Sequence, residues 1–285
     1  MIKLKIAIQK SGRLNEDSLR ILKESGISIS NGLNQLKSTV SNFPMEILFL
    51  RNSDIPQYLK DGVVDVAIIG ENILIEKGNS IEVLDKLNFS KCRVSLAVPK
   101  SMEYNSIQDL QGKQIATSYP NTLNDFLSKK GIEADLHQIS GSVEIAPNIG
   151  LADAICDIVS SGSTLFKNNL KEVEIMFRSE AVLAVSPKIS EEGKVILDKL
   201  QFRIQSVLKA RRSKYILMNA PDNKIEEIVK LLPGMRSPTV LPLAEKGWSS
   251  IHTVVEKNEL WSVVDELKLH GAEGILVIPI EKMVL

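Results

Sequence analysis

The chain has 285 residues, of which 44% are hydrophobic and 25% are charged, and its 35 Lys and Arg residues balance its 35 Asp and Glu residues. A chain of this length predicts about two globular domains, or three small ones. The formal net charge of zero argues against nucleic acid as a bulk electrostatic partner.

The first residues, MIKLKIAIQKSGR, form an apolar run that is too short and too often interrupted by Lys for a signal peptide. No later segment of the sequence reaches the length that spans a membrane. We therefore expect a cytoplasmic protein without a membrane partner.

Cysteine and histidine residues give no metal or nucleophile signature. Cys92 and Cys156 both lie in apolar, strand-like stretches, which predicts small reduced core residues. His137, His252 and His270 stand apart from one another, and we assign none of them chemistry. The sequence also lacks a Walker A loop and a Gly-x-Gly-x-x-Gly motif, so ATP would not be held in the usual kinase or dinucleotide manner.

A basic glycine turn follows the first predicted strand. Lys3 to Ile8 turns from alternating Lys to apolar residues, as a strand does on entering a core, and Lys10-Ser11-Gly12-Arg13 leads into a helix over Leu14 to Glu24. Such a turn, at the carboxyl end of a strand, is where α/β folds bind anions. The alternative, that both cations are merely solvated, stays open.

The run Val63 to Gly70 is nearly continuously apolar, which is typical of a parallel strand buried on both faces. Its acid, Asp65, lies near the start of the strand and is interpreted as a turn or cap residue. Glu71 follows the far end of the strand, on the ligand side of the sheet, and is the better site candidate.

The α/β pattern restarts after Pro99. Strands over Ser80 to Leu87 and Cys92 to Val98 precede it, and a return strand is predicted at Ala181 to Val185. Two lobes result, one from residues 1–98 with 179–210 and the other from 99–178, in an α/β arrangement that resembles type II periplasmic binding proteins. Arg93, just before the crossing, would point into the cleft between the lobes.

A loop of small hydroxyl residues follows the predicted strand Ala154 to Val159. Its residues Ser160, Ser161, Gly162, Ser163 and Thr164 offer hydroxyls and unobstructed N–H groups ahead of a helix, which together favour a phosphate group. Asp153 and Asp157 flank the strand, and a carboxylate beside a phosphate site suits sugar hydroxyls or a magnesium ion. The pattern predicts a phosphorylated sugar; the plain alternative is a turn followed by a helix cap.

The last block, residues 213–285, predicts a separate domain after an Arg211-Arg212-Ser213 linker. Its order of strands and helices is βαββαβ, the ferredoxin-like split βαβ unit, which is common as a regulatory module. Its predicted elements are Lys214 to Asn219, Lys224 to Leu232, Ser237 to Leu241, Trp248 to Val255, Leu260 to Leu269 and Gly274 to Ile280.

The string AICDIVSSGSTL is similar to the phosphoribosyl-diphosphate (PRPP) loop of phosphoribosyltransferases, with Cys156 standing where the first acid of the usual pair would be. Together with IAIQKSGRL, IPQYLKDGVVDVAIIGEN, IATSYPNTL and LLPGMRSPTVLPLA, the chain resembles the long form of ATP phosphoribosyltransferase over essentially its whole length. The resemblance implies the first step of histidine biosynthesis: ATP and PRPP react, with Mg²⁺, to give phosphoribosyl-ATP and pyrophosphate under inhibition by L-histidine.

The resemblance also implies roles for individual residues. Asp153, Asp157 and Glu144 would lie near the reacting sugar, with Glu144 a guess for the general base and the Mg²⁺ ligands left unassigned. The PRPP-binding set would be Asp153, Ala154, Asp157, Ser160, Ser161, Gly162, Ser163, Thr164 and Leu165. ATP and pyrophosphate would be bound by Lys10, Ser11, Gly12, Arg13, Glu71 and Arg93.

Regulation is implied for the last block. The positions that match the family's histidine pocket are Asn219, Met235, Ser237, Thr239 and Gly274. The family also implies a homo-oligomer, with dimers and hexamers both possible. Two rival classes remain: a solute-binding or sensing protein on the same two-lobed fold, which would bind without turnover, and a purely regulatory protein, which would leave the acidic phosphoribosyl loop unexplained.

Overall fold

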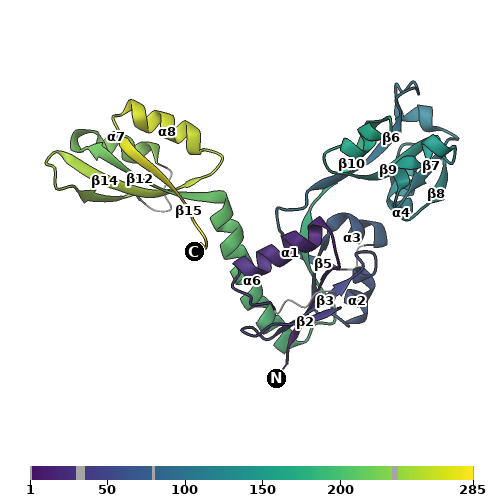
Figure 1. Cartoon of the computed structure of the whole chain (residues 1–285), viewed down its shortest axis with the longest axis horizontal. Coiled ribbons are helices and arrows are strands. Elements are labelled where there is room, and N and C mark those ends of the chain that lie inside the picture. The colour runs from purple at the N-terminus through teal and green to yellow at the C-terminus, as the bar shows by residue number, and fades with distance from the viewer. Residues whose placement is uncertain (1, 30–35, 79–80, 233–236, 285) are drawn as a thin grey trace. The chain divides into compact units, whose positions relative to one another are not determined.

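The computed structural model describes residues 2–29, 36–78, 81–232 and 237–284 (Figure 1). The chain divides into two compact units, one of Met1–Arg20 with Ser28–Leu197 and the other of Ile21–Ile27 with Asp198–Leu285. None of the described helices is long and apolar enough to cross a membrane.

The first sheet of the larger unit has six strands in the order β2-β3-β1-β4-β11-β5. β1 pairs in parallel with β3 and β4, whereas β11 runs antiparallel to β4. All five residues of β4 are buried, which confirms the predicted buried strand. The strands are β1 (Leu4–Gln9), β2 (Lys37–Thr39), β3 (Met45–Leu50), β4 (Val66–Gly70), β5 (Glu82–Lys86) and β11 (Ala181–Val185), and the helices are α1 (Arg13–Glu24), α2 (Ile55–Asp61) and α3 (Glu71–Lys77).

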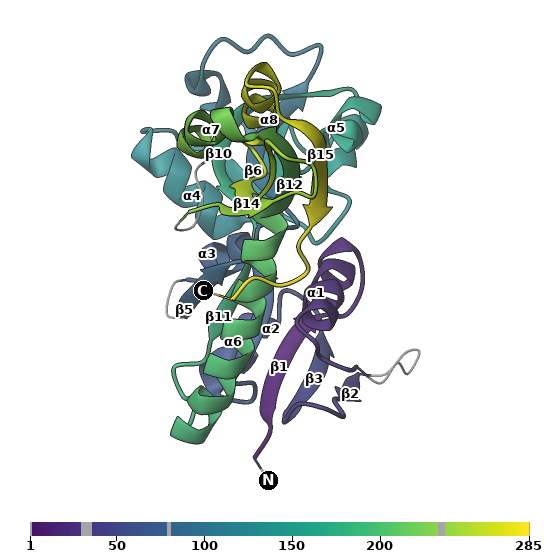
Figure 2. The same cartoon turned by 90° about the vertical axis from the view of Figure 1, so that its left-hand side faces the viewer.

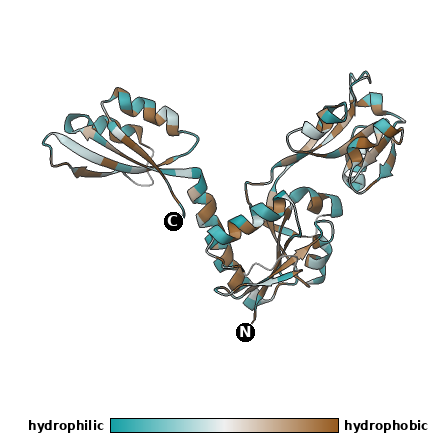
Figure 3. Ribbon diagram, in the orientation of Figure 1, coloured by the Kyte–Doolittle hydropathy of each residue, from teal (hydrophilic) through white to brown (hydrophobic). Residues whose placement is uncertain are grey.

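The second sheet has five strands in the order β10-β6-β9-β7-β8. β9 lies at its centre, parallel to β7 and antiparallel to β6. Hydrophobic residues concentrate along such central strands (Figure 3). The strands are β6 (Cys92–Pro99), β7 (Gln114–Thr117), β8 (Asp135–Gln138), β9 (Ala154–Val159) and β10 (Leu170–Ser179); the helices are α4 (Pro120–Lys129) and α5 (Ser163–Lys167), with 3₁₀ turns at Ile107–Leu110, Val143–Ile145 and Pro147–Ile149.

The expected lobe boundary at Pro99 is wrong. β6 was expected in the first lobe, but its residues Val94, Leu96 and Val98 are buried in the core of the second sheet, and Pro99 only ends the strand. The chain crosses earlier, at residues 88–91, and returns at Ser179–Ala181 as expected. The two sheets and the two crossings give the predicted two-lobed α/β architecture.

A buried carboxylate joins the two lobes. Glu76, near the end of α3, is 5% exposed and accepts hydrogen bonds from the N–H groups of Asn121 and Thr122 at 3.0 and 2.9 Å. The hydroxyl of Thr122 donates a third, at 2.6 Å. These are first-turn groups of α4, which have no acceptor within their own helix. Glu76 therefore supplies the cap that α4 lacks in its own sequence.

The smaller unit holds a four-stranded antiparallel sheet in the order β13-β14-β12-β15. Together with its two helices this order confirms the predicted ferredoxin-like module. α7 and α8 cover the same face of the sheet (Figure 2) and share its core. The elements are α6 (Glu191–Arg212), β12 (Ser213–Pro221), the 3₁₀ turn Asp222–Lys224, α7 (Ile225–Leu231), β13 (Thr239–Pro242), β14 (Trp248–Glu256), α8 (Leu260–Leu269) and β15 (Glu273–Pro279).

The segment predicted as a linker is not a loop. α6 continues to Arg212 and β12 begins at Ser213, so no irregular residue separates them. Arg211 is held in this helix by an ion pair with Glu24, its Nη2 lying 2.8 Å from the carboxylate. The three polar residues therefore belong to regular structure: Arg211 and Arg212 end α6, and Ser213 pairs with Glu256 at the start of β12.

Candidate functional site

The loop after β9 opens onto a cavity of about 290 Å³. Gly162, at the N-terminus of α5, has φ near +80°, a conformation that favours glycine. The lining residues are Cys92, Glu144, Ile155, Asp157, Ile158, Val159, Ser160, Ser161, Gly162, Thr164 and Leu165. The structure thus gathers most of the predicted PRPP set around one space.

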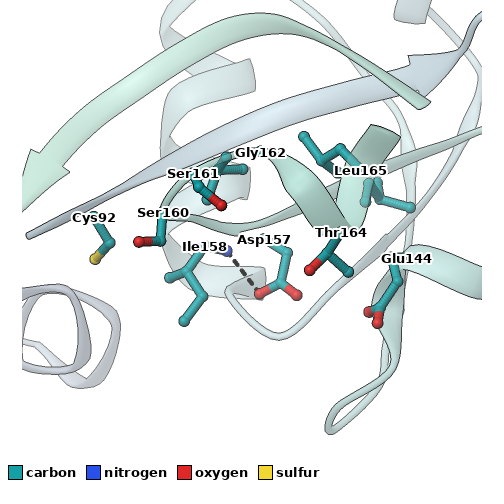
Figure 4. Close-up of a pocket in the computed structure, with 11 residues that line it drawn as sticks. Cys92, Glu144, Asp157, Ile158, Ser160, Ser161, Gly162, Thr164 and Leu165 are labelled. Carbon is teal, nitrogen blue, oxygen red and sulfur yellow. Dashed lines mark hydrogen bonds between the residues drawn. The ribbon is translucent and has the colours of Figure 1, made fainter. Parts of the chain in front are cut away.

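Donors of this loop are available for a bound anion. The N–H groups of Thr164 and Leu165 lie in the first turn of α5, where a helix offers them no acceptor. Ser161 and Ser163 bring their hydroxyl oxygens within 3.0 Å of each other. Figure 4 shows the Thr164 hydroxyl and the Asp157 carboxylate turned toward the same space, with Glu144 on its far side. Hydroxyl and N–H donors of this kind suit a phosphate group.

Asp157 is half-buried in the wall of this cavity and accepts a hydrogen bond from the N–H of Ile158 at 2.8 Å. Burial raises the pKa of its carboxyl to about 6, because the charged form is poorly solvated, and the nearby Glu144 carboxylate acts in the same direction. The hydrogen bond from Ile158 opposes the shift. The Asp157 carboxylate can therefore accept further hydrogen bonds, and sugar hydroxyls are suitable donors.

Asp153 and Ala154 do not line this cavity, so the structure does not bring Asp153 together with Asp157 as the sequence predicted. Both lie at the start of β9, and the four residues of extended chain from Asp153 to Asp157 span about 13 Å. Asp153 instead accepts a hydrogen bond from the N–H of Gln114 at 3.0 Å. It begins the strand in the same way as Asp65, whose carboxylate accepts from the N–H of Lys5 and which was predicted to be a cap residue.

A second cavity, of about 230 Å³, adjoins the first, since Cys92, Ile158 and Ser160 line both. Arg13 lines it, and its Nη1 lies 3.5 Å from the Ser160 hydroxyl, so the structure brings this residue of the basic turn next to the loop after β9. Lys10, Ser11 and Gly12 are exposed beside it but do not line it. Its lining is Gln9, Arg13, Leu14, Asn52, Gly70, Asn72, Ser90, Lys91, Cys92, Ile158, Ser160 and Ala181.

Glu71 was expected in the site, but its neighbour occupies that place. The Glu71 carboxylate pairs with Lys86 of β5 at 3.3 Å and does not line either cavity. Asn72 lines the second cavity and is held by the Tyr119 hydroxyl, 2.8 Å from its Nδ2, and by Ser179. The helix begins at Glu71, so successive side chains leave its first turn in different directions.

Arg93 does not point freely into the cleft as expected. Its Nε and Nη2 donate to the two carboxylate oxygens of Glu172 at 2.5 and 2.6 Å, and its Nη1 donates to the backbone oxygen of Ser160 at 2.9 Å. All three nitrogens of the Arg93 guanidinium thus donate hydrogen bonds to protein groups.

Several lining residues escaped the sequence reasoning. Gln9, Asn52, Asn72 and Lys91 carry no motif, because amides and single lysines are common on protein surfaces. Cys92 was expected in a core and instead lies between the two cavities, whereas Cys156 is buried as predicted. A hint existed for Asn72 alone, because it directly follows the acid that was predicted at the strand end.

Few side chains that could bind a metal ion lie together in the described part of the chain. Among the described residues, no three or more His, Cys, Asp or Glu side chains cluster so that they could hold a metal ion. Mg²⁺ is commonly bound through one or two carboxylates and the phosphates of a substrate. Asp157 and Glu144 in the first cavity fit that looser arrangement.

The predicted regulatory residues that the structure describes fall into two groups in the C-terminal domain. Asn219 and Gly274 are neighbours, since a Cβ on Gly274 would meet the Asn219 amide at 3.5 Å. Thr239 pairs with His252 on β14, the strand between β13 and β12, and Ser237 is exposed just before β13. Met235 lies outside the described residues.

The fold and the site fit a phosphoribosyltransferase, because a hydroxyl-rich loop at a helix start and a partly buried carboxylate share one cavity. Family models agree: "HisG: ATP phosphoribosyltransferase" matches residues 51–206 and "HisG, C-terminal domain" matches residues 210–282. Relatives named ATP phosphoribosyltransferase are 57% identical over 99% of this chain and 98% of their own length in Cytophaga hutchinsonii, and 54% identical over 99% and 100% in Phocaeicola vulgatus.

A solved structure is also similar. The ATP phosphoribosyl transferase (HisG:HisZ) complex from Thermotoga maritima matches with a TM-score of 0.61 and 32% identity, over 71% of this chain and 98% of that one. The chain belongs to the ATP phosphoribosyltransferase family, whose members catalyse the first step of histidine biosynthesis.

The raised pKa of Asp157 predicts a specific pH dependence. If its ionised form binds the sugar, kcat/KM for PRPP falls as the pH drops through about 6. Replacing Glu144 with Gln removes a like charge, lowers the pKa of Asp157 and moves this acid limb to lower pH. Glu133→Gln, at an exposed position, is the control. A pH profile whose midpoint stays fixed in Glu144→Gln, or rises, contradicts the role.

Proposed function

We propose that the first cavity binds PRPP and that the chain transfers its phosphoribosyl group to N1 of the adenine of ATP. The loop from Ser160 to Leu165 holds the 5′-phosphate, and Asp157 holds the ribose hydroxyls. The observation that carries this proposal is the placement of Asp157 and Thr164 around one cavity at the carboxyl end of β9. In open α/β sheets this is the end at which ligands bind.

Charge stabilisation suits this chemistry better than a protein nucleophile. The bond from the anomeric carbon to pyrophosphate breaks with its electron pair leaving on oxygen, and the lone pair of adenine N1 forms the new bond. Positive charge develops on the ribose in between, so fixed carboxylates nearby lower the barrier. Asp157 and Glu144 are the carboxylates in the cavity wall, and Glu144 remains our candidate for the general base.

The second cavity is the proposed site for ATP. Its cations, Arg13 and Lys91, suit the triphosphate, while the amides of Gln9 and Asn52 suit the edge of adenine, which presents both donors and acceptors. The cavities meet at Ser160, so a base in one can reach a sugar in the other. Lys10 lies at the rim, where it adds positive charge for pyrophosphate.

Mg²⁺ is proposed to enter with the pyrophosphate of PRPP. When bound, it neutralises charge on the leaving group. Asp157 and Glu144 are the side chains of the first cavity that could contribute an oxygen ligand, and both remain available to the sugar as described.

Histidine inhibition is proposed for the C-terminal module, and the chain is proposed to be a cytoplasmic homo-oligomer. Asn219, Ser237 and Thr239 carry amide and hydroxyl groups that suit an amino acid's carboxylate, ammonium and imidazole. They lie far along the chain from the loop, which suits an inhibitor acting through coupling free energy instead of competition. Met235 belongs to this proposal by resemblance alone.

Release of pyrophosphate from ATP and PRPP tests the reaction. Wild-type protein is expected to turn over, while Asp157→Asn loses about 10- to 10²-fold in kcat/KM, because a charged hydrogen bond to the sugar is worth about 1.5–3 kcal/mol and matters most in the transition state. The same variant should melt at or above the wild-type temperature at pH 8, since it removes a charge that burial disfavours.

The effect of Asp157 on the free energy of unfolding changes with pH in a defined direction. The pKa of Asp157 is raised in the folded protein, so its contribution to the free energy of unfolding is largest below its ordinary pKa and is lost as the pH rises through about 6. Wild type and Asp157→Asn should therefore converge near pH 4. Ligand binding without turnover in wild type would favour a solute-binding protein, and near-wild-type kcat/KM in Asp157→Asn would refute its catalytic role.

Histidine regulation has its own test. Ser237→Ala with Thr239→Val should leave turnover without histidine unchanged and weaken inhibition at least about tenfold, which is the loss expected from one or two hydrogen bonds to a charged ligand. Ser262→Ala, an exposed hydroxyl on α8, is the matched control. Unchanged inhibition, with histidine competitive against PRPP, would place the inhibitor in the catalytic cavity.

A further inference from the structure

The residue at which the two cavities meet is held by two arginines. Ser160 receives Nη1 of Arg93 on its backbone oxygen at 2.9 Å and has Nη1 of Arg13 3.5 Å from its hydroxyl. Ser160 is exposed at the start of the loop, so its position depends on such contacts more than on packing. Because the chain is continuous, the position of Ser160 determines where the hydroxyl and N–H donors of the following residues, up to Leu165, lie.

Glu172 orients the Arg93 side chain. It lies on β10, which pairs with β6, and both of its carboxylate oxygens accept from the guanidinium. Ser95, which is 1% exposed, donates its hydroxyl to the same carboxylate at 2.6 Å. The guanidinium lowers the pKa of Glu172, so the carboxylate is ionised throughout the working pH range.

A two-pronged arginine–carboxylate pair fixes direction as well as charge. Both groups are planar, so two parallel hydrogen bonds set the plane of the guanidinium and aim its remaining N–H groups. In this structure the third contact falls on the Ser160 oxygen. A lysine at position 93 would keep the positive charge but lose the fixed geometry. Arg93→Lys therefore distinguishes the effect of geometry from the effect of charge.

We propose that Glu172 and Arg93 are positioning residues that hold the phosphate loop in its binding conformation, and that Arg93 is not itself a substrate ligand. The inference rests on the proposed function of the loop. Its chain of contacts runs from Ser95 to Glu172, to Arg93 and to the first residue of the loop. A substrate phosphate bound by backbone N–H groups is sensitive to displacements of about 1 Å, so loss of the pair weakens its binding.

Ribose 5-phosphate is the probe, because it carries the sugar and the loop's phosphate without pyrophosphate. Its binding to the full chain is measured by calorimetry for wild type, Glu172→Gln, Arg93→Lys and the double variant. Each single variant is expected to bind about tenfold more weakly, and the double variant little more weakly still, because both remove the same interaction. KM for PRPP should rise in parallel while kcat and KM for ATP stay within about twofold.

The direction in which Glu172→Gln changes the affinity for ribose 5-phosphate distinguishes this proposal from direct binding of the substrate by Arg93. If Arg93 bound the substrate directly, weakening its tie to Glu172 would leave ribose 5-phosphate binding unchanged or tighten it, and Arg93→Lys would retain most of the affinity. Either result overturns the positioning role. Wild type that fails to bind the probe or to release pyrophosphate would instead refute the proposed function itself.

A matched control comes from the same strand. Glu174→Gln changes a carboxylate that bonds the Tyr104 hydroxyl. This variant is expected to bind the probe as wild type does, and a loss equal to that of Glu172→Gln would mean general damage to β10 and overturn the proposal. If Glu172→Gln does not fold, Ser95→Ala takes its place, with an expected two- to threefold loss of binding. No loss of binding in Ser95→Ala would contradict the proposed chain of contacts from Ser95 through Glu172 and Arg93 to the loop.

Discussion

Asp157 is a carboxylate placed where burial works against its charge. It accepts a hydrogen bond from the N–H of its own neighbour, and Glu144 adds a like charge across the cavity. Such a group raises the free energy of the unliganded protein at neutral pH and lowers it again when donors arrive. Sugar hydroxyls are suitable donors, and the adjacent loop offers hydroxyl and N–H groups to the same cavity. In the proposed function, the sugar of the substrate supplies the donors that this carboxylate lacks.

Other parts of the larger unit serve to keep this arrangement in place. Glu76 caps α4 from the other lobe, and the Glu172–Arg93 pair reaches the loop from β10 and β6, neighbouring strands of the second sheet. Asn88 and Ser90 in the crossing have φ values of 60° and 48°, which are uncommon for residues other than glycine. Fixed contacts thus surround the cavities, while the crossing itself carries backbone strain.

Periodicity and turn chemistry were enough to predict much of the fold. The apolar run of β4, the hydroxyl loop after β9 and the βαββαβ order each act locally, so sequence alone reveals them. Sheet membership is not local, and β6 was assigned to the wrong lobe because its pairing with β9 and β10 depends on distant strands. Pro99 marks only the end of a strand.

The candidate site divides in the same way. Asp157 and the loop follow one another in the chain, so their shared cavity was predictable. Asp153 looked equivalent by sequence distance, yet strand length separates it from the loop. The roles of Glu71 and Arg93 depended on partners far away in sequence, Lys86 and Glu172, and no local pattern encodes a partner.

A crystal structure of the full chain with PRPP tests the central claim most directly. We expect the 5′-phosphate oxygens within about 3.2 Å of the backbone nitrogens of Thr164 and Leu165, and the ribose hydroxyls on the Asp157 carboxylate. A phosphate held by Arg13 in the second cavity, with the loop after β9 free of ligand, would contradict it.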